Sequence, residues 1–331
     1  MDILLVLTLA VILGAEFVNG LTDAPNAIAT VVSTRALSFR KAVIMAAVLN
    51  FAGVMSGTAV AATIGKGIID SKAIDLITIS AAMISIVIWS SMAYFWRKRL
   101  GIPTSESHAL IAALAGAGLA TGGTDVLLWI GWKKVLIGLG FSTFLGLLGS
   151  YFLTRIVRKL SAPLPLYPTR STFRKLQILS SGFMAFSHGS NDGQKFMGVF
   201  ALALVLGGMY EKFTIPLWAI VLLASVMALG TSIGGWRIIR TMGMRMTPLA
   251  PYQGFSAETA AASTITLASH FGIPLSTTHT IGTSIIGAGV AHRKSSLKMD
   301  VVTQIVLAWI LTFPVCGILA FIITHIARIV F

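Results

Sequence analysis

Charged residues are what this sequence has least of. Only 11% of its 331 residues are Asp, Glu, Lys or Arg, and just 11 of them are acids, whereas soluble domains carry about 25% charged residues. Hydrophobic residues make up 56% of the chain, and its mean hydropathy is +0.87. The deficit in charge extends along the whole length, so the composition excludes an ordinary soluble domain and predicts a chain dissolved in lipid.

Other features are missing as well. The single cysteine, Cys316, lies in an apolar run, which excludes a disulfide framework, and no Cys/His zinc spacing is present. No Gly-x-x-x-x-Gly-Lys-(Ser/Thr) loop occurs, so we expect no ATP-driven machinery, no cofactor and no enzyme. The first twenty residues lack a basic start and carry Asp2 and Glu16, so we interpret them as a membrane element and not as a signal peptide.

Apolar runs recur throughout the chain, and each is long enough to cross about 30 Å of hydrocarbon as a helix. Strands of a membrane barrel would instead alternate over about 10 residues. The apolar segments lie at 2–34, 42–65, 74–96, 104–120, 126–153, 176–206, 214–234, 252–270, 274–290 and 299–328. We therefore predict an all-α polytopic membrane protein with about 10–12 transmembrane helices, some of them broken or re-entrant at polar motifs.

Basic residues cluster in the short loops between these segments, and they give the chain its net charge of +14. Such a distribution indicates membrane topology and some steering of anions, so we expect no nucleic-acid partner. The segment 155–175 holds basic residues and prolines but no acid, which places it in the cytoplasm. The basic residues at Arg97–Arg99 and at Arg293 and Lys294 predict further inner loops.

The two halves of the chain share short polar motifs in the same order. Pro103–His108 matches Pro274–His279, and Gly20–Asp23 pairs with Gly189–Asp192. Counting the crossings gives the halves opposite orientations. We predict a first inverted repeat at 1–154, a basic linker at 155–175 and a second repeat at 176–331, with a binding site at their interface near the membrane midplane.

Five acids lie inside the apolar segments. Each would cost about 2.5–3.5 kcal/mol at a lipid-facing helix centre, so they must face a cavity, an ion or one another. They are Glu16, Asp23, Glu106, Asp192 and Glu258.

Around Asp23 and Asp192, glycines and one proline stand beside amide and carboxylate side chains. Such a stretch breaks a helix and frees carbonyl groups, which with the side-chain oxygens suit a hard cation. The predicted ligands of a coupling cation are Asp23, Asn26, Asn191, Asp192, Glu106 and Gln194.

The Pro-x-Ser-x-x-His motifs predict the opposite kind of site. Proline suits the first helical turn and serine or threonine its N-cap, and the start of a helix attracts phosphate-like anions. We expect His108 and His279, one turn further on, to hold the motifs in place. The predicted ligands of a tetrahedral oxyanion are Ser105, Ser107, Ser276, Thr277 and Thr278, with Asn26 and Lys195.

At these residues the chain resembles the PiT family of inorganic phosphate transporters. That family carries a Gly-Ala-Asn-Asp-type motif in each half, read here as Gly20–Ala27 and Gly189–Lys195, together with the Pro-Ser-His motif. The resemblance implies a homodimeric, multi-pass symporter of the cell membrane that couples inorganic phosphate to sodium or protons. Thr22 replaces the family's asparagine whereas Asn191 retains it, so we expect the two halves to differ in function.

Other readings stay open at this point. The same fold could carry sulfate or a metal–phosphate complex, or could conduct anions passively without coupling. An intramembrane aspartyl protease would also need two aspartates, here Asp23 and Asp192, that share a proton. The chain lacks the Tyr-Asp and Gly-x-Gly-Asp contexts of such enzymes, and their chemistry gives the serine motifs no role.

Overall fold

The structure is a computed structural model that describes residues 2–95, 101–292 and 297–330. The basic residues Arg97–Arg99, Arg293 and Lys294 lie outside the described residues, so the orientation they predict is not tested by it. Within the described ranges the chain is helical, and its one β-bridge joins Ile69 to Leu127.

The helices of the first half are α1 (Ile3–Thr22), η1 (Ala24–Ile28), α2 (Ala29–Ser33), α3 (Phe39–Val54), α4 (Ala59–Gly67), α5 (Leu76–Phe95), α6 (Glu106–Gly122), η2 (Thr124–Val126) and α7 (Trp129–Ser161). Those of the second half are α8 (Leu166–Leu206), α9 (Leu217–Ser232), α10 (Trp236–Ile239), the π-helical turn η3 (Arg240–Arg245), α11 (Pro251–His270), α12 (Thr277–His292) and α13 (Met299–Val330). Every apolar segment of the sequence contains a helix, which confirms the all-α prediction.

Within the described residues, four helical stretches are long and apolar enough to cross a membrane: Ile3–Ser33, α5, α7 and α13. The pairs α3–α4 and α9–α10/η3 bend by 66° and 61°, and they bring the count to six if each pair is one span. The other helices are shorter or less apolar, so length and composition alone do not mark them as spans.

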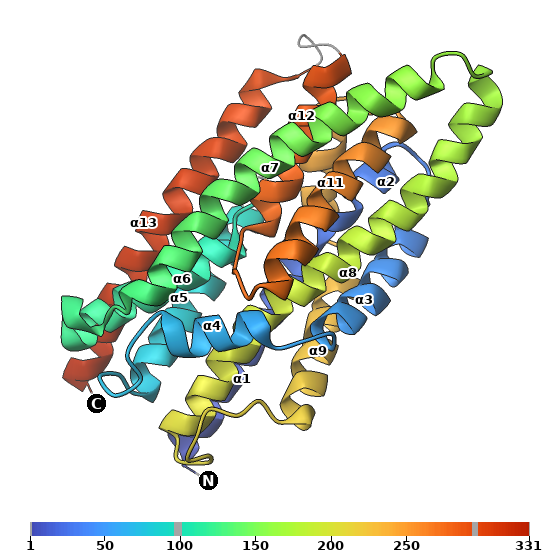
Figure 1. Ribbon diagram of the computed structural model, residues 1–331. Coiled ribbons are helices and arrows are strands. Elements are labelled where there is room, and N and C mark those ends of the chain that lie inside the picture. The colour runs from blue at the N-terminus through green and yellow to red at the C-terminus, as the bar shows by residue number, and fades with distance from the viewer. Residues whose placement is uncertain (1, 96–100, 293–296, 331) are drawn as a thin grey trace.

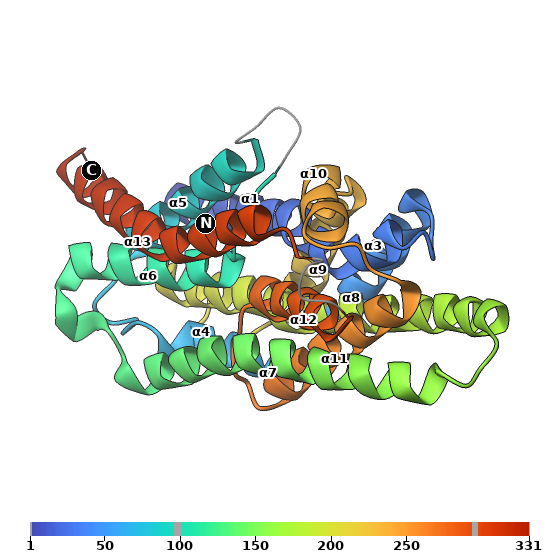
Figure 2. The same ribbon diagram turned by 90° about the horizontal axis from the view of Figure 1, so that it is seen from above.

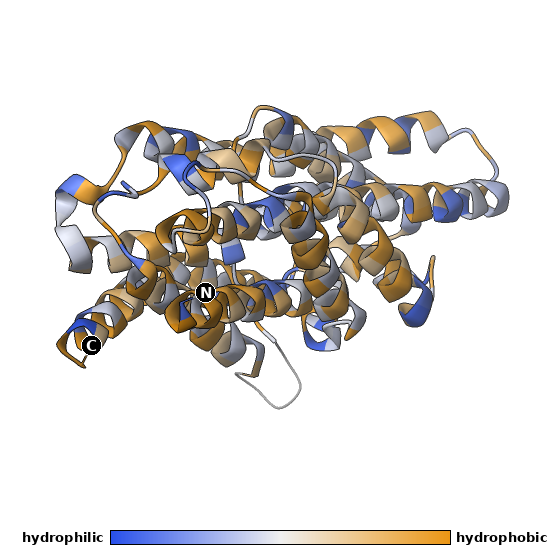
Figure 3. Cartoon of the chain, turned by 90° about the horizontal axis from the view of Figure 1, so that it is seen from below, coloured by the Kyte–Doolittle hydropathy of each residue, from blue (hydrophilic) through white to orange (hydrophobic). Residues whose placement is uncertain are grey.

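The outer helices present apolar side chains to their surroundings. On α7, Phe141 and Phe144 are exposed, and on α13 so are Ile310 and Ile318. Seen from above, these two helices lie on opposite sides of α6 and α12 (Figure 2), and the turn between α7 and α8 projects at the end away from both termini (Figures 1 and 2). Hydrophobic residues extend along most of the helices (Figure 3). Because large exposed apolar surfaces are rare on soluble proteins, the exposed faces of α7 and α13 indicate contact with lipid.

Helices α6 and α12 lie inside the bundle, and most of their residues are buried. Helix α6 packs against α5 and α13, whereas α12 packs against α11 and α7. Each inner helix therefore pairs with the last long helix of the other half. This exchange brings the starts of α6 and α12, which carry the Pro-Ser-His motifs, to the middle of the molecule.

The break predicted at the first aspartate motif is confirmed. Helix α1 ends at Thr22, Asp23 caps its C-terminus, and Pro25 lies in the first turn of the 3₁₀ helix η1, which leads into α2. Proline cannot donate a backbone hydrogen bond, which explains why the α-helix stops here.

The break predicted at the second motif is wrong, because α8 runs without interruption through Asp192. This motif has no proline, so the hydrogen-bond ladder stays complete. Its glycine serves packing instead: a Cβ on Gly189 would lie 2.3 Å from the carbonyl oxygen of Asn50 on α3. The prediction mistook a glycine needed for close contact between two helices for one that ends a helix.

The basic segment 155–175 is mostly helical. It comprises the end of α7 and the start of α8, and only residues 162–165 between them are not helical. Pro163 and Pro165 lie in this turn, and Pro168 lies in the first turn of α8, where proline is tolerated. The segment is therefore a tight connection between two long helices.

Candidate functional site

The two Pro-Ser-His motifs meet at the starts of α6 and α12. Ser105 caps α6 and accepts a hydrogen bond from the His108 backbone at 3.2 Å, and Ser276 accepts one from the His279 backbone at 3.1 Å. The Oγ atoms of Ser105 and Ser276 lie 2.8 Å apart. The expectation that the two helix N-termini come together is thus met in the geometry.

The histidines extend this contact one turn further along both helices. The rings of His108 and His279 lie 4.4 Å apart, and His279 also packs on Trp309 at 4.1 Å. His108 Nδ1 is 2.7 Å from the Ser105 hydroxyl. Ring stacking and this hydrogen bond fix the two helix starts relative to each other, as the sequence predicts for structural histidines.

Hydroxyl groups on each helix reach the loop that precedes the other helix. Ser107 on α6 donates to the carbonyl oxygen of Leu275 at 2.9 Å. Thr278 on α12 lies 3.2 Å from the carbonyl oxygen of Thr104. The two helix starts are therefore joined by a crossed pair of contacts as well as by the serine contact.

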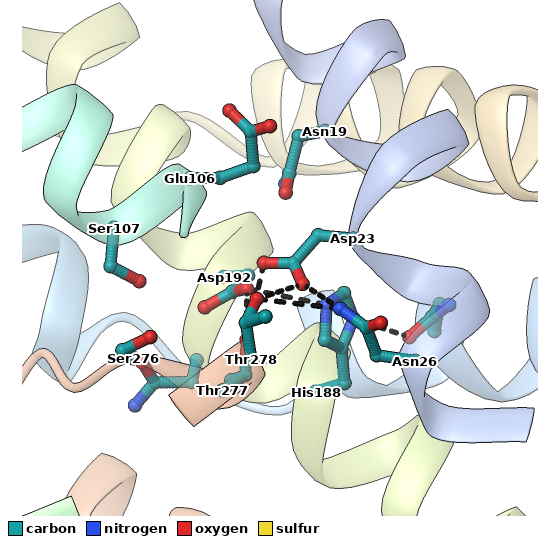
Figure 4. A network of polar contacts seen from close by, with 12 residues as sticks. Asn19, Asp23, Asn26, Glu106, Ser107, His188, Asp192, Ser276, Thr277 and Thr278 are labelled. Carbon is teal, nitrogen blue, oxygen red and sulfur yellow. Dashed lines mark hydrogen bonds and ion pairs between the residues drawn. The ribbon is translucent and has the colours of Figure 1, made fainter. Parts of the chain in front are cut away.

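The first aspartate motif places its carboxylate against α12. Asp23 accepts a hydrogen bond from Asn26 at 2.6 Å and another from Thr278, and the Thr277 hydroxyl lies 3.3 Å from its second oxygen. Figure 4 shows Asp23, Asn26 and Thr278 converging from two separate helical segments. All four side chains are buried.

The second aspartate motif approaches the same point from α8. Asp192 accepts a hydrogen bond from Thr277 at 2.6 Å and forms an ion pair with Lys195, one turn further along α8. Lys195 also donates to the Ser107 hydroxyl at 2.5 Å and to the carbonyl oxygen of Leu275 at 2.7 Å. The ammonium group is 1% exposed, so it is held entirely by protein oxygens.

The hydroxyl of Thr277 is common to both motifs, since it contacts Asp23 and Asp192. Two buried carboxylates therefore adjoin one hydroxyl and one ammonium, that of Lys195. The two carboxylates carry two negative charges and the ammonium carries one positive charge, so one negative charge is uncompensated unless a proton or another cation joins the site. An unpaired buried charge of this kind is costly. The electrostatics of the site thus favour cation binding beside Asp23.

His188, one turn before Asp192 on α8, belongs to the site but was not among the predicted ligands. Its Nδ1 must donate to Asn50 Oδ1, 3.1 Å away, because that oxygen only accepts. Its Nε2 then faces Asp192 Oδ2 at 3.2 Å, which is favourable only with a proton or cation between them. Ligand atoms of Asp23, His188 and Asp192 all lie within 4.8 Å of one another. His188 and Asp192 are four residues apart, which makes them neighbours on one face of a helix. This spacing was the signal in the sequence that indicates His188 as part of the site.

Three of the predicted cation ligands make other contacts. Gln194 accepts from the Val60 backbone at 3.0 Å and so holds the start of α4. Asn191 donates to Ser269 at 2.8 Å and braces the loop before α12. Glu106 accepts from Thr22 and from Ser90, each at 2.9 Å. In this structure these three side chains hold the start of α4, the start of α6 and the loop before α12 in place.

Thr22, where the family has asparagine, thus differs from Asn191 in its contact. Thr22 donates to a carboxylate at the start of α6, whereas Asn191 binds the end of α11 and the following loop. The two matched positions therefore support different elements: Thr22 holds the start of α6, and Asn191 holds the loop before α12.

The two other membrane acids accept hydrogen bonds, although Glu16 Oε1 is buried without a partner among the described residues. Glu16 accepts from Asn19 at 3.0 Å. Glu258 accepts from Thr30, from Ser180 and, at 3.3 Å, from Gln177. Both carboxylates are fully buried, but only Glu258 bridges helices, since Asn19 lies on the same helix as Glu16.

A pocket of about 1060 Å³ opens beside the Glu258 network. Thr34 lines it and donates to Gln177 at 2.7 Å, which connects the pocket wall to the network. Arg35, Arg158 and Arg170 line the same pocket. Its basic wall would attract anions, in keeping with the steering expected from the loops.

A multi-pass helical bundle with two helix starts and two buried carboxylates meeting at its centre is the architecture of a membrane transporter. Residues 19–320 match the family model described as "Phosphate transporter family". The chain belongs to this family. Its membership confirms the resemblance found in the sequence and places the chain among transporters and not enzymes, so the aspartyl protease alternative is wrong.

Curated relatives resemble the chain over nearly its full length. A protein of Bacillus subtilis (strain 168) is 37% identical over 337 residues and covers 100% of both chains. One of Rhizobium meliloti (strain 1021) is 42% identical over 319 residues, 96% of this chain and 94% of its own. Each is named "Probable low-affinity inorganic phosphate transporter".

A solved structure described as "The sodium-dependent phosphate transporter" has the same fold. Its TM-score is 0.87 with 22% sequence identity, and the match covers 100% of both chains. This agreement confirms the polytopic helical architecture.

Proposed function

We propose that the chain carries inorganic phosphate into the cell by symport with sodium or protons. The names of the relatives support the substrate, and the sodium dependence of the protein in the similar solved structure supports sodium as the coupling ion. The site supports the same assignment, because it combines groups suited to an anion with groups suited to a cation.

The observation that carries the proposal is the contact between Ser105 and Ser276 at 2.8 Å. It brings the positive ends of α6 and α12, with their free backbone N–H groups, to one point. Two such ends suit a tetrahedral oxyanion better than one. In this proposal phosphate binds at Ser105, Ser107, Ser276, Thr277 and Thr278, and the cation binds beside Asp23.

The division into inverted repeats is part of the proposal, with repeats at 1–154 and 176–331 joined by 155–175. Ser105 contacts its matched residue Ser276, and His108 contacts its matched residue His279. Residues related by a two-fold axis touch each other only where they lie on that axis. The two contacts therefore support a pseudo-two-fold axis through the starts of α6 and α12.

The direct test is uptake of labelled phosphate by purified protein in liposomes, with sodium and proton gradients imposed independently. Accumulation above the outside concentration under either gradient is expected. Equilibration without accumulation would indicate a passive anion channel, and no entry under both gradients would contradict the proposal. Competition by arsenate but not by sulfate would assign the anion class.

A metal–phosphate complex is a second candidate cargo, and one observation favours it. Asp23, His188 and Asp192 offer two carboxylates and an imidazole within 4.8 Å of one another, a ligand set that also suits divalent metals. Uptake of phosphate measured with and without Mg²⁺ or Mn²⁺ would test it. Comparable uptake after chelation of divalent metals would contradict this candidate and leave phosphate symport in place.

The resemblance also predicts a homodimer. The apolar faces of α7 and α13 could bury part of their surface against a second copy as well as against lipid. Cross-linking in native membranes, followed by the mass of the product, would test this prediction.

A further inference from the structure

The two aspartate motifs align at Gly20 with Gly189 and at Asp23 with Asp192, and three residues after each aspartate they place side chains of different chemistry. Asp23 is followed three residues later by Asn26, and Asp192 three residues later by Lys195. Asn26 Nδ2 donates to Asp23 Oδ1, and Lys195 Nζ contacts Asp192 Oδ1 in the same way. Lysine therefore occupies in the second half the position that asparagine occupies in the first.

The partners of these two residues match as well. Asn26 lies 3.3 Å from Thr278 Oγ1, whereas Lys195 lies 2.5 Å from Ser107 Oγ. Thr278 and Ser107 occupy equivalent places in the two Pro-Ser-His motifs. Each of these hydroxyls also reaches a carbonyl in the opposite loop, at Thr104 and Leu275.

The environment of the Lys195 ammonium is that of a small monovalent cation. A carboxylate oxygen, a hydroxyl oxygen and a backbone carbonyl surround it. Carboxylate, hydroxyl and carbonyl oxygens are the ligands that hard cations take in proteins. An ammonium group has three N–H bonds, and these three acceptors use all of them. In this arrangement Lys195 has no donor left for phosphate.

The matched position in the first half contains no tethered charge. It offers the Asp23 carboxylate, the Thr278 hydroxyl and the Thr104 carbonyl. The Asn26 Oδ1 atom is buried and has no hydrogen-bond partner among the described residues. A buried acceptor without a donor is unfavourable, and a cation bound beside Asp23 would satisfy it.

We propose that Lys195 is a tethered cation that permanently fills the second-half cation position, so that sodium exchanges only at the Asp23–Asn26 position of the first half. This inference rests on the proposed symport function and specifies its coupling. A chain with asparagine at both positions would couple one more sodium ion per phosphate. The side chain at position 195 thereby sets the stoichiometry of transport.

The test compares the wild type with Lys195→Asn in liposomes at zero membrane voltage. Equilibrium accumulation of labelled phosphate is measured under a tenfold sodium gradient, and the ratio of ²²Na⁺ to phosphate is counted. One additional coupled sodium raises the accumulation by about tenfold, and the ion ratio should rise by one. Lys212→Asn, which removes an exposed loop lysine, is the matched control and should behave as the wild type does.

The converse variant, Asn26→Lys, tests the same idea independently of how Lys195→Asn folds. A second tethered ammonium should remove sodium dependence, so that phosphate equilibrates without accumulating. An unchanged ion ratio in Lys195→Asn, or wild-type sodium coupling in Asn26→Lys, would overturn the inference. So would wild-type accumulation driven by protons alone, with no effect of sodium on either protein. None of these results affects the proposed function, which fails only if the wild type does not accumulate phosphate under either gradient.

Discussion

The hydroxyl of Ser105 lies 2.8 Å from that of Ser276, although 171 residues separate them in the chain. Each serine caps an inner helix, and each helix packs against the last long helix of the other half. A ligand bound at this contact touches both halves at once. Movement of one half against the other must therefore alter the ligand's surroundings, which is what a transporter that opens to alternate sides requires.

Thr277 joins the two aspartate motifs, so its hydroxyl should be needed for both ions. Thr277→Val keeps the shape of the side chain but removes a hydrogen bond to a charged group, worth roughly 1.5–3 kcal/mol. We expect the half-saturating phosphate concentration to rise about tenfold or more, as measured by uptake at varied phosphate. Thr277→Ser retains the hydroxyl and should remain within a few-fold of the wild type. Equal behaviour of the two variants would count against this role.

Asp23→Asn and Asp192→Asn should both abolish coupled uptake, but they should differ in their effect on stability. Asp192→Asn leaves the buried Lys195 ammonium without its counterion, and breaking a buried ion pair costs about 3–5 kcal/mol. Asp23→Asn leaves no unpaired cation, so its cost should be smaller by a few kcal/mol. Unfolding in detergent would measure both.

The double variant Asp192→Asn with Lys195→Met is the control for this comparison, since it removes both charges. It should recover part of the lost stability without recovering transport. If Asp23→Asn and Asp192→Asn destabilised the protein equally, the assignment of the Lys195 charge to Asp192 would be wrong.

The sequence predicted the features that local chemistry determines. Serine before a helix and proline before the serine specify a helix start, so the capping roles of Ser105 and Ser276 followed from their neighbours alone. Pro25 likewise specified the end of α1. Apolar runs of sufficient length indicated the positions of the helices.

Features that depend on packing between distant segments could not be predicted in this way. Gln194 binds the start of α4, more than a hundred residues earlier in the chain, and nothing beside it in the sequence indicates that partner. Gly189 could mark either a helix break or a close approach, and only the position of α3 decides between them. Lys195 was predicted as an anion ligand from its charge alone, and only the fold shows which three oxygens accept its hydrogen bonds.

Gln194 and Asn26 offer a direct test of which amide belongs to the cation site. Gln194→Ala removes one hydrogen bond to the start of α4, so it should cost about 1 kcal/mol of stability and leave sodium dependence unchanged. Asn26→Ala removes a side chain in contact with Asp23, so it should raise the sodium concentration needed for half-maximal uptake several-fold. Uptake at varied sodium measures both. A larger sodium effect in Gln194→Ala would restore that residue as a cation ligand.

Gly189 places α8 close to α3, and this contact orients His188. A Cβ at residue 189 would lie 2.3 Å from the Asn50 carbonyl oxygen, and that oxygen cannot move without its helix. Gly189→Ala should therefore push the helices apart, at a cost of about 1–3 kcal/mol. It should also weaken the 3.1 Å contact between Asn50 and His188, so that uptake falls more than the amount of folded protein does.

Gly140→Ala on α7 is the matched control, because a Cβ there meets nothing within 4 Å. In a helix interior alanine is more stable than glycine by about 0.5–1 kcal/mol, so this variant should not be destabilised. Unfolding in detergent and uptake per folded molecule would separate the two effects, and a Gly189→Ala protein as stable and active as Gly140→Ala would show that the close approach of α3 is not required.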